Sequence, residues 1–172
     1  MKTKTVTPNG NGRTATAKRH TLHWTGEERE RIVAALNELL GNYQVHYQKL
    51  RNYHWNVKGS DFFDLHVELE AQYREAQEHI DLIAERVRVF RMRPLSTFAE
   101  YLKASTIQED GTVPASDTMV KNLLGDYVLL LDQCVAGVDV AVELHDQGTE
   151  KMLKDFIAVI EKHHWMLSSF AS

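Results

Sequence analysis

Two pairs of metal-ligating side chains lie one helical turn apart within a single uninterrupted stretch of the chain. His66 and Glu70 form the first pair, and Asp81 and Glu85 form the second. On a helix the members of a pair are about 40° apart, and all four residues fall within a sector of about 100°. Imidazole and carboxylate together are a ligand set for iron and similar divalent metals. Charged residues at this spacing are also typical of a solvated helix face, and this alternative stays open for each pair alone.

The stretch that carries both pairs has the pattern of one long amphipathic helix. Residues 61 to about 90 contain no Pro or Gly, and their apolar residues recur every three or four positions. The predicted buried stripe consists of Leu65, Leu69, Tyr73 (or Gln72), Ala76, Ile80, Ile83 and Val87. The two pairs border this stripe, so their side chains are expected at the edge of the packed face.

The separation of the two pairs limits how they could bind metal. Glu70 and Asp81 are eleven residues apart, which is about 16 Å along a helix, whereas a metal–ligand bond is about 2 Å long. One ion therefore cannot be held by both pairs of the same chain. The pairs are nearly symmetric about Glu75 and Ala76, so a second chain related by a two-fold axis there would place its second pair opposite the first pair. Each such dimer would contain two identical sites shared between the chains.

The segment before this helix predicts another long helix. Thr25 and Glu28 have the spacing of a capping box, and an apolar stripe then runs from Ile32 to His54. This spacing places His54 on the core-facing side at the helix end, where it can face ligands of the next helix. Residues 58–60, Lys-Gly-Ser, form the predicted turn between the two helices.

A long connection follows the second helix. Arg93-Pro94 is expected to end that helix, because Pro disfavours helical backbone in the residue before it. The connection, about residues 91 to 116, contains one short helical turn that Thr97 and Glu100 open as a capping box. Fully extended, it could reach on the order of 80 Å, against about 40 Å for the second helix. It can therefore cross a whole bundle.

Two further helices complete the expected fold. The third helix begins near Ser116-Asp117 and has an apolar stripe that continues to His145. Gly148 is expected to end this helix, and Thr149 is expected to cap the fourth helix. Together these patterns predict an all-α four-helix bundle with a long crossover, carrying a short helix, between helices 2 and 3.

The ordered set of ligand-type residues resembles the ferroxidase signature of the Dps family, the small ferritin-like proteins of starved bacteria. The matching ligand positions are His54, His66, Glu70, Asp81 and Glu85. Flanking residues match as well: Trp55, Val57-Lys58-Gly59, Phe62-Phe63, His79-Ile80, Ala84, Arg86, Tyr101-Leu102 and residues 162–167. The resemblance covers about residues 25 to 170. The family usually has Asp at the position of Glu70, whose carboxylate reaches one methylene further.

This resemblance implies a function and an assembly. Dps proteins form hollow dodecamers, oxidise Fe(II), preferably with hydrogen peroxide, and store Fe(III) as a mineral, which suppresses hydroxyl-radical damage to DNA. By resemblance, the iron would be held between two subunits by His54, His66, Glu70, Asp81 and Glu85. Trp55 follows the first ligand and could donate an electron to a damaging oxidant, or it could simply be a core aromatic residue.

Acidic residues near the start of the fourth helix correspond to the family's iron-entry pore at a three-fold axis. Matching on Thr149 places the pore positions at Asp146, Lys151 and Asp155, so the middle one is basic, with Glu150 adjacent. Asp146, Glu150 and Asp155 are therefore pore candidates, and ordinary helix-end charges are the alternative.

A second carboxylate and histidine pair lies near the C-terminal end. Glu161 and His164 have the Glu-x-x-His spacing of carboxylate-bridged di-iron bundles, but the second copy that such sites need is missing. We therefore interpret His163 and His164 as structural residues.

The composition indicates one ordinary globular domain. The chain has 172 residues, of which 43% are hydrophobic and 26% charged, which is sufficient for a sizeable core. Cys134 is its only cysteine, so no internal disulfide can form, which fits a reducing cytoplasm. The N-terminus has no apolar region typical of a signal peptide, and no apolar run approaches the ~18 residues of a membrane span.

The charge is distributed unevenly along the chain. Residues 1–21 are predicted to be a flexible basic tail, and residues 22–172 the bundle. The tail cations are Lys2, Lys4, Arg13, Lys18 and Arg19. These five charges have no acidic partner in the tail, so the formal net charge of −4 leaves −9 on the remainder. Such a tail could contact DNA phosphates without sequence specificity, or it could be an inert terminus.

Two functions from different classes follow from these features. The first is a ferroxidase and iron-storage protein. The second is a DNA-compacting nucleoid protein with weak or lost ferroxidase activity, which Glu70 and the basic tail favour. A helical protein that binds a membrane surface is not favoured, because packing within the bundle accounts for the apolar stripes.

Overall fold

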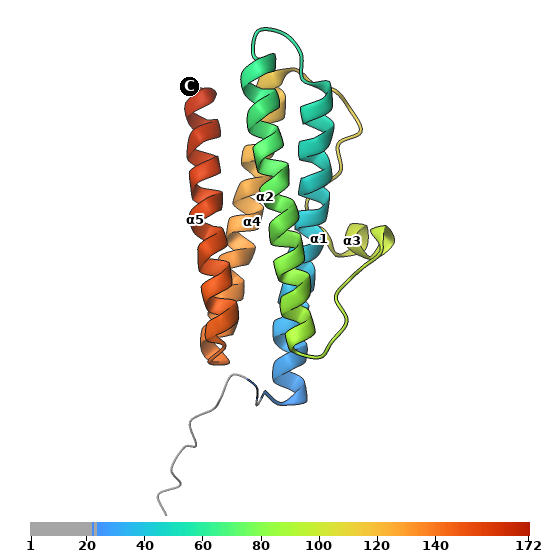
Figure 1. The fold of residues 1–172 in the computed structure, drawn as a ribbon, viewed down its shortest axis with the longest axis vertical. Coiled ribbons are helices and arrows are strands. Elements are labelled where there is room, and N and C mark those ends of the chain that lie inside the picture. The colour runs from blue at the N-terminus through green and yellow to red at the C-terminus, as the bar shows by residue number, and fades with distance from the viewer. Residues whose placement is uncertain (1–21, 23) are drawn as a thin grey trace, which may run out of the picture.

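Five helices make up the part of the chain that the computed structural model describes, Leu22 and residues 24–172. Four long helices pack side by side, and a short one lies outside them against the first (Figure 1). The helices are α1 (Gly26–Asn56), α2 (Phe62–Val89), α3 (Phe98–Ala104), α4 (Ser116–Glu143) and α5 (Gln147–Phe170). The predicted four-helix bundle with a short helix in the crossover is confirmed. None of the helices in this described part is long and apolar enough to span a membrane.

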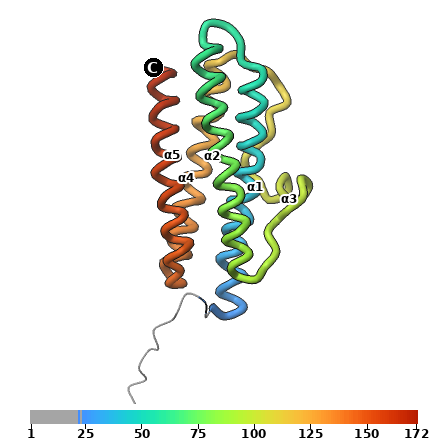
Figure 2. Tube along the Cα trace, viewed as in Figure 1, coloured from blue at the N-terminus to red at the C-terminus, as the bar shows by residue number. Residues whose placement is uncertain are grey.

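The crossover determines the directions of the helices. It leaves α2 at one end of the bundle, runs beside α1 past α3, and enters α4 at the opposite end (Figures 1 and 2). As a result α2 and α4 run in the same direction, and α1 and α5 run in the other. The turn between α1 and α2 lies at the same end as the C-terminus. This arrangement puts the last turn of α1 next to the first turns of α2.

Asn42, a fully buried residue of α1, holds the crossover in place through hydrogen bonds. Asn42 Oδ1 accepts hydrogen bonds from Ser105 Oγ at 2.6 Å, Thr106 N at 2.7 Å and Ile107 N at 3.0 Å. Its amide nitrogen donates to Gln133 Oε1 of α4 at 2.7 Å. The asparagine thereby satisfies backbone donors of a segment that has no regular structure of its own.

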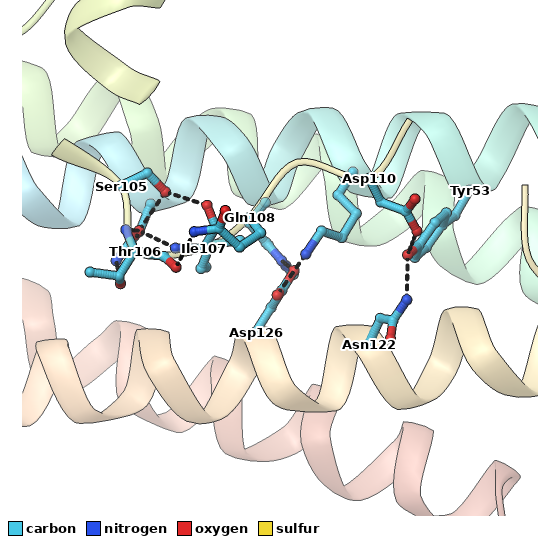
Figure 3. Close-up of polar contacts among 11 residues, drawn as sticks. Tyr53, Ser105, Thr106, Ile107, Gln108, Asp110, Asn122 and Asp126 are labelled. Carbon is cyan, nitrogen blue, oxygen red and sulfur yellow. Dashed lines mark hydrogen bonds and ion pairs between the residues drawn. The ribbon is translucent and has the colours of Figure 1, made fainter. Parts of the chain in front are cut away.

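A second anchor lies farther along the crossover. Asp110 Oδ2 accepts a hydrogen bond from the Tyr53 hydroxyl, which accepts one from Asn122 Nδ2 at 2.9 Å (Figure 3). Earlier in the crossover, α3 approaches α1 at Gly41, where a Cβ atom would lie 3.1 Å from the carbonyl oxygen of Tyr101. A glycine in a helix interior costs about 1 kcal/mol relative to alanine, and the close approach that Gly41 permits offsets this cost.

Most helix boundaries agree with those predicted from the sequence, and two of them differ. The capping boxes at Thr25 and Thr97 are both present. α2 ends at Val89, before the predicted stop at Arg93-Pro94, because Arg91 adopts the left-handed conformation with φ of 62° and redirects the chain.

The junction between α4 and α5 also corrects the prediction. α4 ends at Glu143 instead of continuing to Gly148, and His145 is left-handed with φ of 54°. The cap of α5 is Asp146, whose side chain accepts a hydrogen bond from Thr149 N at 3.1 Å, so Thr149 is a capped residue and not the cap. Asp is as good an N-cap as Thr, and it stands nearer the left-handed residue that ends α4.

The core is apolar along its length but contains a polar band near the middle. Where the stripe of α2 left two options, the structure buries Gln72 more deeply than Tyr73. Gln72 can be buried because its amide is satisfied: Tyr127 Oη donates to its oxygen at 2.9 Å, and its nitrogen donates to Glu68 Oε1 at 2.8 Å.

Candidate metal centre

The structure brings together His54, His66 and Glu70 where α1 meets α2. A potential ligand atom of each residue lies within 4.8 Å of those of the other two. His54 comes from the last turn of α1, and the other two are one turn apart near the start of α2. Within the described residues, this is the group of three His, Cys, Asp or Glu side chains that meets this distance criterion. The donor set suits iron and other borderline divalent ions.

Hydrogen bonds fix the orientation of both imidazoles. His54 Nδ1 is 2.8 Å from the carbonyl oxygen of His66, and His66 Nδ1 is 2.9 Å from the carbonyl oxygen of His54. A carbonyl oxygen only accepts, so each Nδ1 carries a proton, which leaves Nε2 as the nitrogen of each ring that can face a metal ion. The rings stack with centroids 3.9 Å apart. The two ligands therefore orient each other through backbone groups.

Aromatic side chains enclose the two imidazoles. The ring of Tyr73 meets His54 edge-on at 5.3 Å between centroids, and Phe62 stacks on His66 at 4.9 Å. His54 is buried and His66 is half-buried. This packing limits the rotation of the ligand rings, so the site is partly organised before any metal binds.

Glu70 forms an ion pair that the sequence analysis missed. Arg74 donates through Nε at 3.0 Å and through a terminal nitrogen to the same carboxylate oxygen. This hydrogen-bonded guanidinium, through its hydrogen bond first and its charge second, lowers the pKa of the Glu70 carboxyl. The carboxylate is therefore ionised, and a metal ion must compete with Arg74 for it. The i,i+4 spacing of Glu70 and Arg74 is the signal that could have found this pair.

The second predicted pair lies elsewhere on α2. Asp81 and Glu85 are both exposed, and neither belongs to the group around His54. Two large apolar residues, Phe63 and Val67, are 79% and 66% exposed on the same helix. At about 100° per residue they fall on the same side of α2 as the acidic pair. One face of α2 thus combines ligand-type carboxylates with uncovered apolar surface.

Trp55 is exposed and is not a core aromatic residue, so that alternative is wrong. Its side chain is 56% exposed, and the guanidinium carbon of Arg51 lies 4.6 Å from its ring centre. The structure places Trp55 next to a ligand in the chain but outside the ligand group itself.

The pore candidates differ in their surroundings. Asp146 is fully buried, pairs with Arg86 and caps α5, so the prediction that it lines a solvent-filled pore is wrong. Glu150 is half-buried and Asp155 is exposed, and each carboxylate accepts a hydrogen bond of 2.6 Å from a lysine one turn away on α5. The tail residues that were predicted to contact DNA, Lys2, Lys4, Arg13, Lys18 and Arg19, lie outside the described part of the chain.

Comparison with known proteins places the chain in a family. A family model described as a ferritin-like domain matches residues 33–172. The DNA protection during starvation protein of Brevibacillus brevis is 40% identical over 139 residues, which are 81% of this chain and 93% of that protein. The DNA protection during starvation protein 2 of Bacillus anthracis is 36% identical over 141 residues, 82% of this chain and 97% of the relative.

Solved structures agree with the sequence comparison. The crystal structure of a Dps protein from Bacillus brevis superposes with a TM-score of 0.84 at 37% identity, covering 87% of this chain and all of that one. The Dps protein from Vibrio cholerae O1, described as a ferritin-like diiron-carboxylate protein, gives 0.83 at 36% identity, with coverage of 85% and 92%. With both the domain and the relatives matched over most of its length, this chain belongs to the Dps family of ferritin-like proteins.

Proposed function

We propose that this protein is a ferroxidase and iron-storage protein that takes Fe(II) as its substrate at sites shared between two chains. The observation that carries this proposal is the group His54, His66 and Glu70, each of which offers one potential ligand atom within 4.8 Å of the other two. Two neutral imidazoles and a carboxylate suit Fe(II), but they leave part of its coordination open. A second chain would complete it.

The surface of α2 supports a shared site. The exposed Asp81 and Glu85 lie on the face that also exposes Phe63 and Val67. Contact between two copies of this face across a two-fold axis would bury that apolar surface. It would also bring the acidic pair of one chain to the His66 side of the other.

The reaction at this site would be the oxidation of two Fe(II) ions by one molecule of hydrogen peroxide. Two Fe(II) ions each give one electron to hydrogen peroxide, the O–O bond breaks, and two protons are taken up to form two water molecules. The residues of this chain bind and position the Fe(II), and the carboxylates offset the added charge of Fe(III). Trp55, beside the first ligand, could supply one electron when only a single Fe(II) is bound.

The same proposal includes the assembly of the protein, the storage of iron and contact with DNA. The relatives named for DNA protection during starvation favour a bacterial cytoplasmic dodecamer that stores Fe(III) mineral and removes peroxide near DNA. Glu150 and Asp155 remain candidates for lining an iron-entry pore. Non-specific DNA contact through the basic tail would depend strongly on salt, and deletion of residues 1–20 should abolish it while sparing iron oxidation.

A double variant tests the proposed function. In His54→Ala with His66→Ala, peroxide-dependent oxidation of anaerobically bound Fe(II), followed by ferric absorbance, should fall to the rate without protein. His164→Ala is the matched control, because His164 is a half-buried histidine of α5 that lies outside the ligand group. An assembled double variant with an unchanged oxidation rate would contradict the site assignment.

A further inference from the structure

The carboxylate of the ligand group is already paired with a cation of the same helix. Arg74 Nε donates a hydrogen bond to Glu70 Oε1 at 3.0 Å, and a terminal nitrogen of the same guanidinium donates to the same oxygen. Arg74 lies one turn after Glu70 on α2, and a carboxylate that precedes its cationic partner at this spacing has the favourable orientation on a helix. A guanidinium therefore occupies one side of the candidate metal centre.

This cation opposes the binding of an ion in either geometry that Glu70 allows. An ion that takes Oε1, or both oxygens, must break the hydrogen bonds from Arg74. An ion that takes Oε2 alone brings a double positive charge close to the guanidinium, and like charges repel at short range. Arginine is not deprotonated in proteins, so a change of pH does not remove this charge. Only a cation that binds more strongly than Arg74 can take over Glu70.

The helix offers Arg74 a second carboxylate after displacement. Glu78 is exposed on α2, at the same four-residue spacing from Arg74 as Glu70. The side chain of Arg74 is 67% exposed, so its guanidinium can move without disturbing the packed face of the helix. Displacement then exchanges one surface ion pair for another, and such pairs contribute little individually. An ion that also bonds to the two imidazoles can offset this small cost.

The donor set decides which ions can displace Arg74. Fe²⁺, Co²⁺ and Zn²⁺ bind imidazole as well as carboxylate, so His54 and His66 add to the affinity for these ions. Mg²⁺ prefers oxygen ligands and gives up its bound water reluctantly, so the charge of Glu70 would have to supply most of its affinity. The ion pair with Arg74 offsets that charge, and Mg²⁺ has no bond to imidazole to compensate.

We propose that Arg74 is a specificity-determining residue of this site, a resident cation that ions with affinity for imidazole displace and that hard ions such as Mg²⁺ do not. This inference rests on the proposed function, in which Asp81 and Glu85 of a second chain add two carboxylates to Glu70. Three carboxylates together would attract any divalent ion. The guanidinium of Arg74 removes part of that attraction and so reserves the site for Fe(II).

Anaerobic titration with Co(II), followed by its visible absorption, measures this effect without any oxidation step. Arg74→Gln removes the charge, so the affinity for Co(II) should rise about two- to fivefold, the range expected for the loss of an exposed ion pair. Millimolar Mg²⁺, added at constant ionic strength, should then compete with Co(II) in this variant. In the wild type, the same Mg²⁺ should leave Co(II) binding unchanged.

Two matched variants separate the charge of Arg74 from other effects. Arg74→Lys keeps a cation at this position and should bind Co(II) as the wild type does, without competition from Mg²⁺. Arg88→Gln removes another exposed arginine of α2, whose guanidinium donates to the carbonyl oxygen of Met92, and it should also match the wild type. If Arg74→Gln bound Co(II) no more tightly than the wild type, or if Mg²⁺ failed to compete in that variant, the proposal would be overturned.

Failure of this inference can be distinguished from failure of the proposed function. The expected effect of Arg74→Gln on Co(II) binding, together with no peroxide-dependent oxidation of Fe(II) by the wild type, would refute the ferroxidase and leave the role of Arg74 intact. Normal oxidation with an unchanged Co(II) affinity in Arg74→Gln would refute the role of Arg74 alone. Absence of Co(II) binding to the wild type would refute both.

Discussion

Asp146 should be essential for stability and unnecessary for iron entry. Its carboxylate is fully buried, accepts a hydrogen bond from Thr149 N, and forms an ion pair with Arg86, whose side chain is 17% exposed. Arg86 Nε also donates to Thr149 Oγ1 at 2.8 Å. Gly148 permits this arrangement, because a Cβ atom there would lie 2.8 Å from the Arg86 guanidinium. Removing the carboxylate therefore leaves a mostly buried cation without its partner.

The expected magnitudes separate the two roles of this residue. Asp146→Asn keeps a capping oxygen but removes the charge, so it should lower the free energy of unfolding by about 3–5 kcal/mol, as for other broken buried ion pairs. Asp146→Ala also loses the cap, which should cost about 1 kcal/mol more. The matched control is Asp155→Asn, whose carboxylate is 62% exposed and pairs with Lys151 on the surface of α5. Its effect on stability should be at most about 0.5 kcal/mol.

Urea unfolding followed by far-ultraviolet circular dichroism measures these differences. All variants must be compared at equal chain concentration, because assembly contributes to apparent stability. If Asp146→Asn matched the wild type in stability and slowed Fe(II) uptake, the buried ion pair would be wrong and the pore role would be restored.

Two further predictions rest on buried ionisable groups. Burial, partly offset by Glu75, lowers the pKa of His79 from 6.5 to about 4. The folded state therefore binds fewer protons than the unfolded chain, so stability is complete above about pH 6.5 and falls by up to about 3 kcal/mol toward pH 4. Relative to wild type, His79→Phe should flatten this dependence in urea unfolding, and an equal slope would contradict the neutral buried ring. Cys134 is fully buried, and burial raises the pKa of its thiol to about 12. A thiol reagent such as DTNB should therefore label Cys134 only after unfolding. Rapid labelling of the native protein would refute this expectation.

Helix existence and the ligand group could be predicted from sequence because both depend on local spacing. The capping boxes at Thr25 and Thr97 are complete within four residues, so their residue types suffice to place them. His66 and Glu70 are one turn apart on α2, and the apolar stripe of α1 carries His54 to the same end of the bundle. Their convergence follows from two adjacent antiparallel helices joined by a short turn.

The remaining features depend on contacts between distant segments. Asp146 is buried because Arg86, sixty residues earlier, reaches it across the bundle, and no local pattern shows this. The reciprocal hydrogen bonds of His54 and His66 involve backbone carbonyls, which leave no trace in residue type. His163 was interpreted as structural because the sequence has no second Glu-x-x-His pair. Its carboxylate neighbours Glu68 and Glu75 lie on another helix, so local spacing does not show them.

The shared site between two chains is the central claim, and subunit complementation tests it most directly. One parent carries His54→Ala and His66→Ala, the other carries Asp81→Ala and Glu85→Ala, and the two are dissociated, mixed equally and reassembled. A mixed dimer joins the intact histidines of one chain to the intact carboxylates of the other at one of its two sites. With half of the dimers mixed, about a quarter of the wild-type sites should return. Peroxide-dependent Fe(II) oxidation should therefore recover to about a quarter of the wild-type rate, whereas neither parent alone should show activity. Absence of recovery in verified mixed dimers would contradict the account, because the ligands would then act within a single chain.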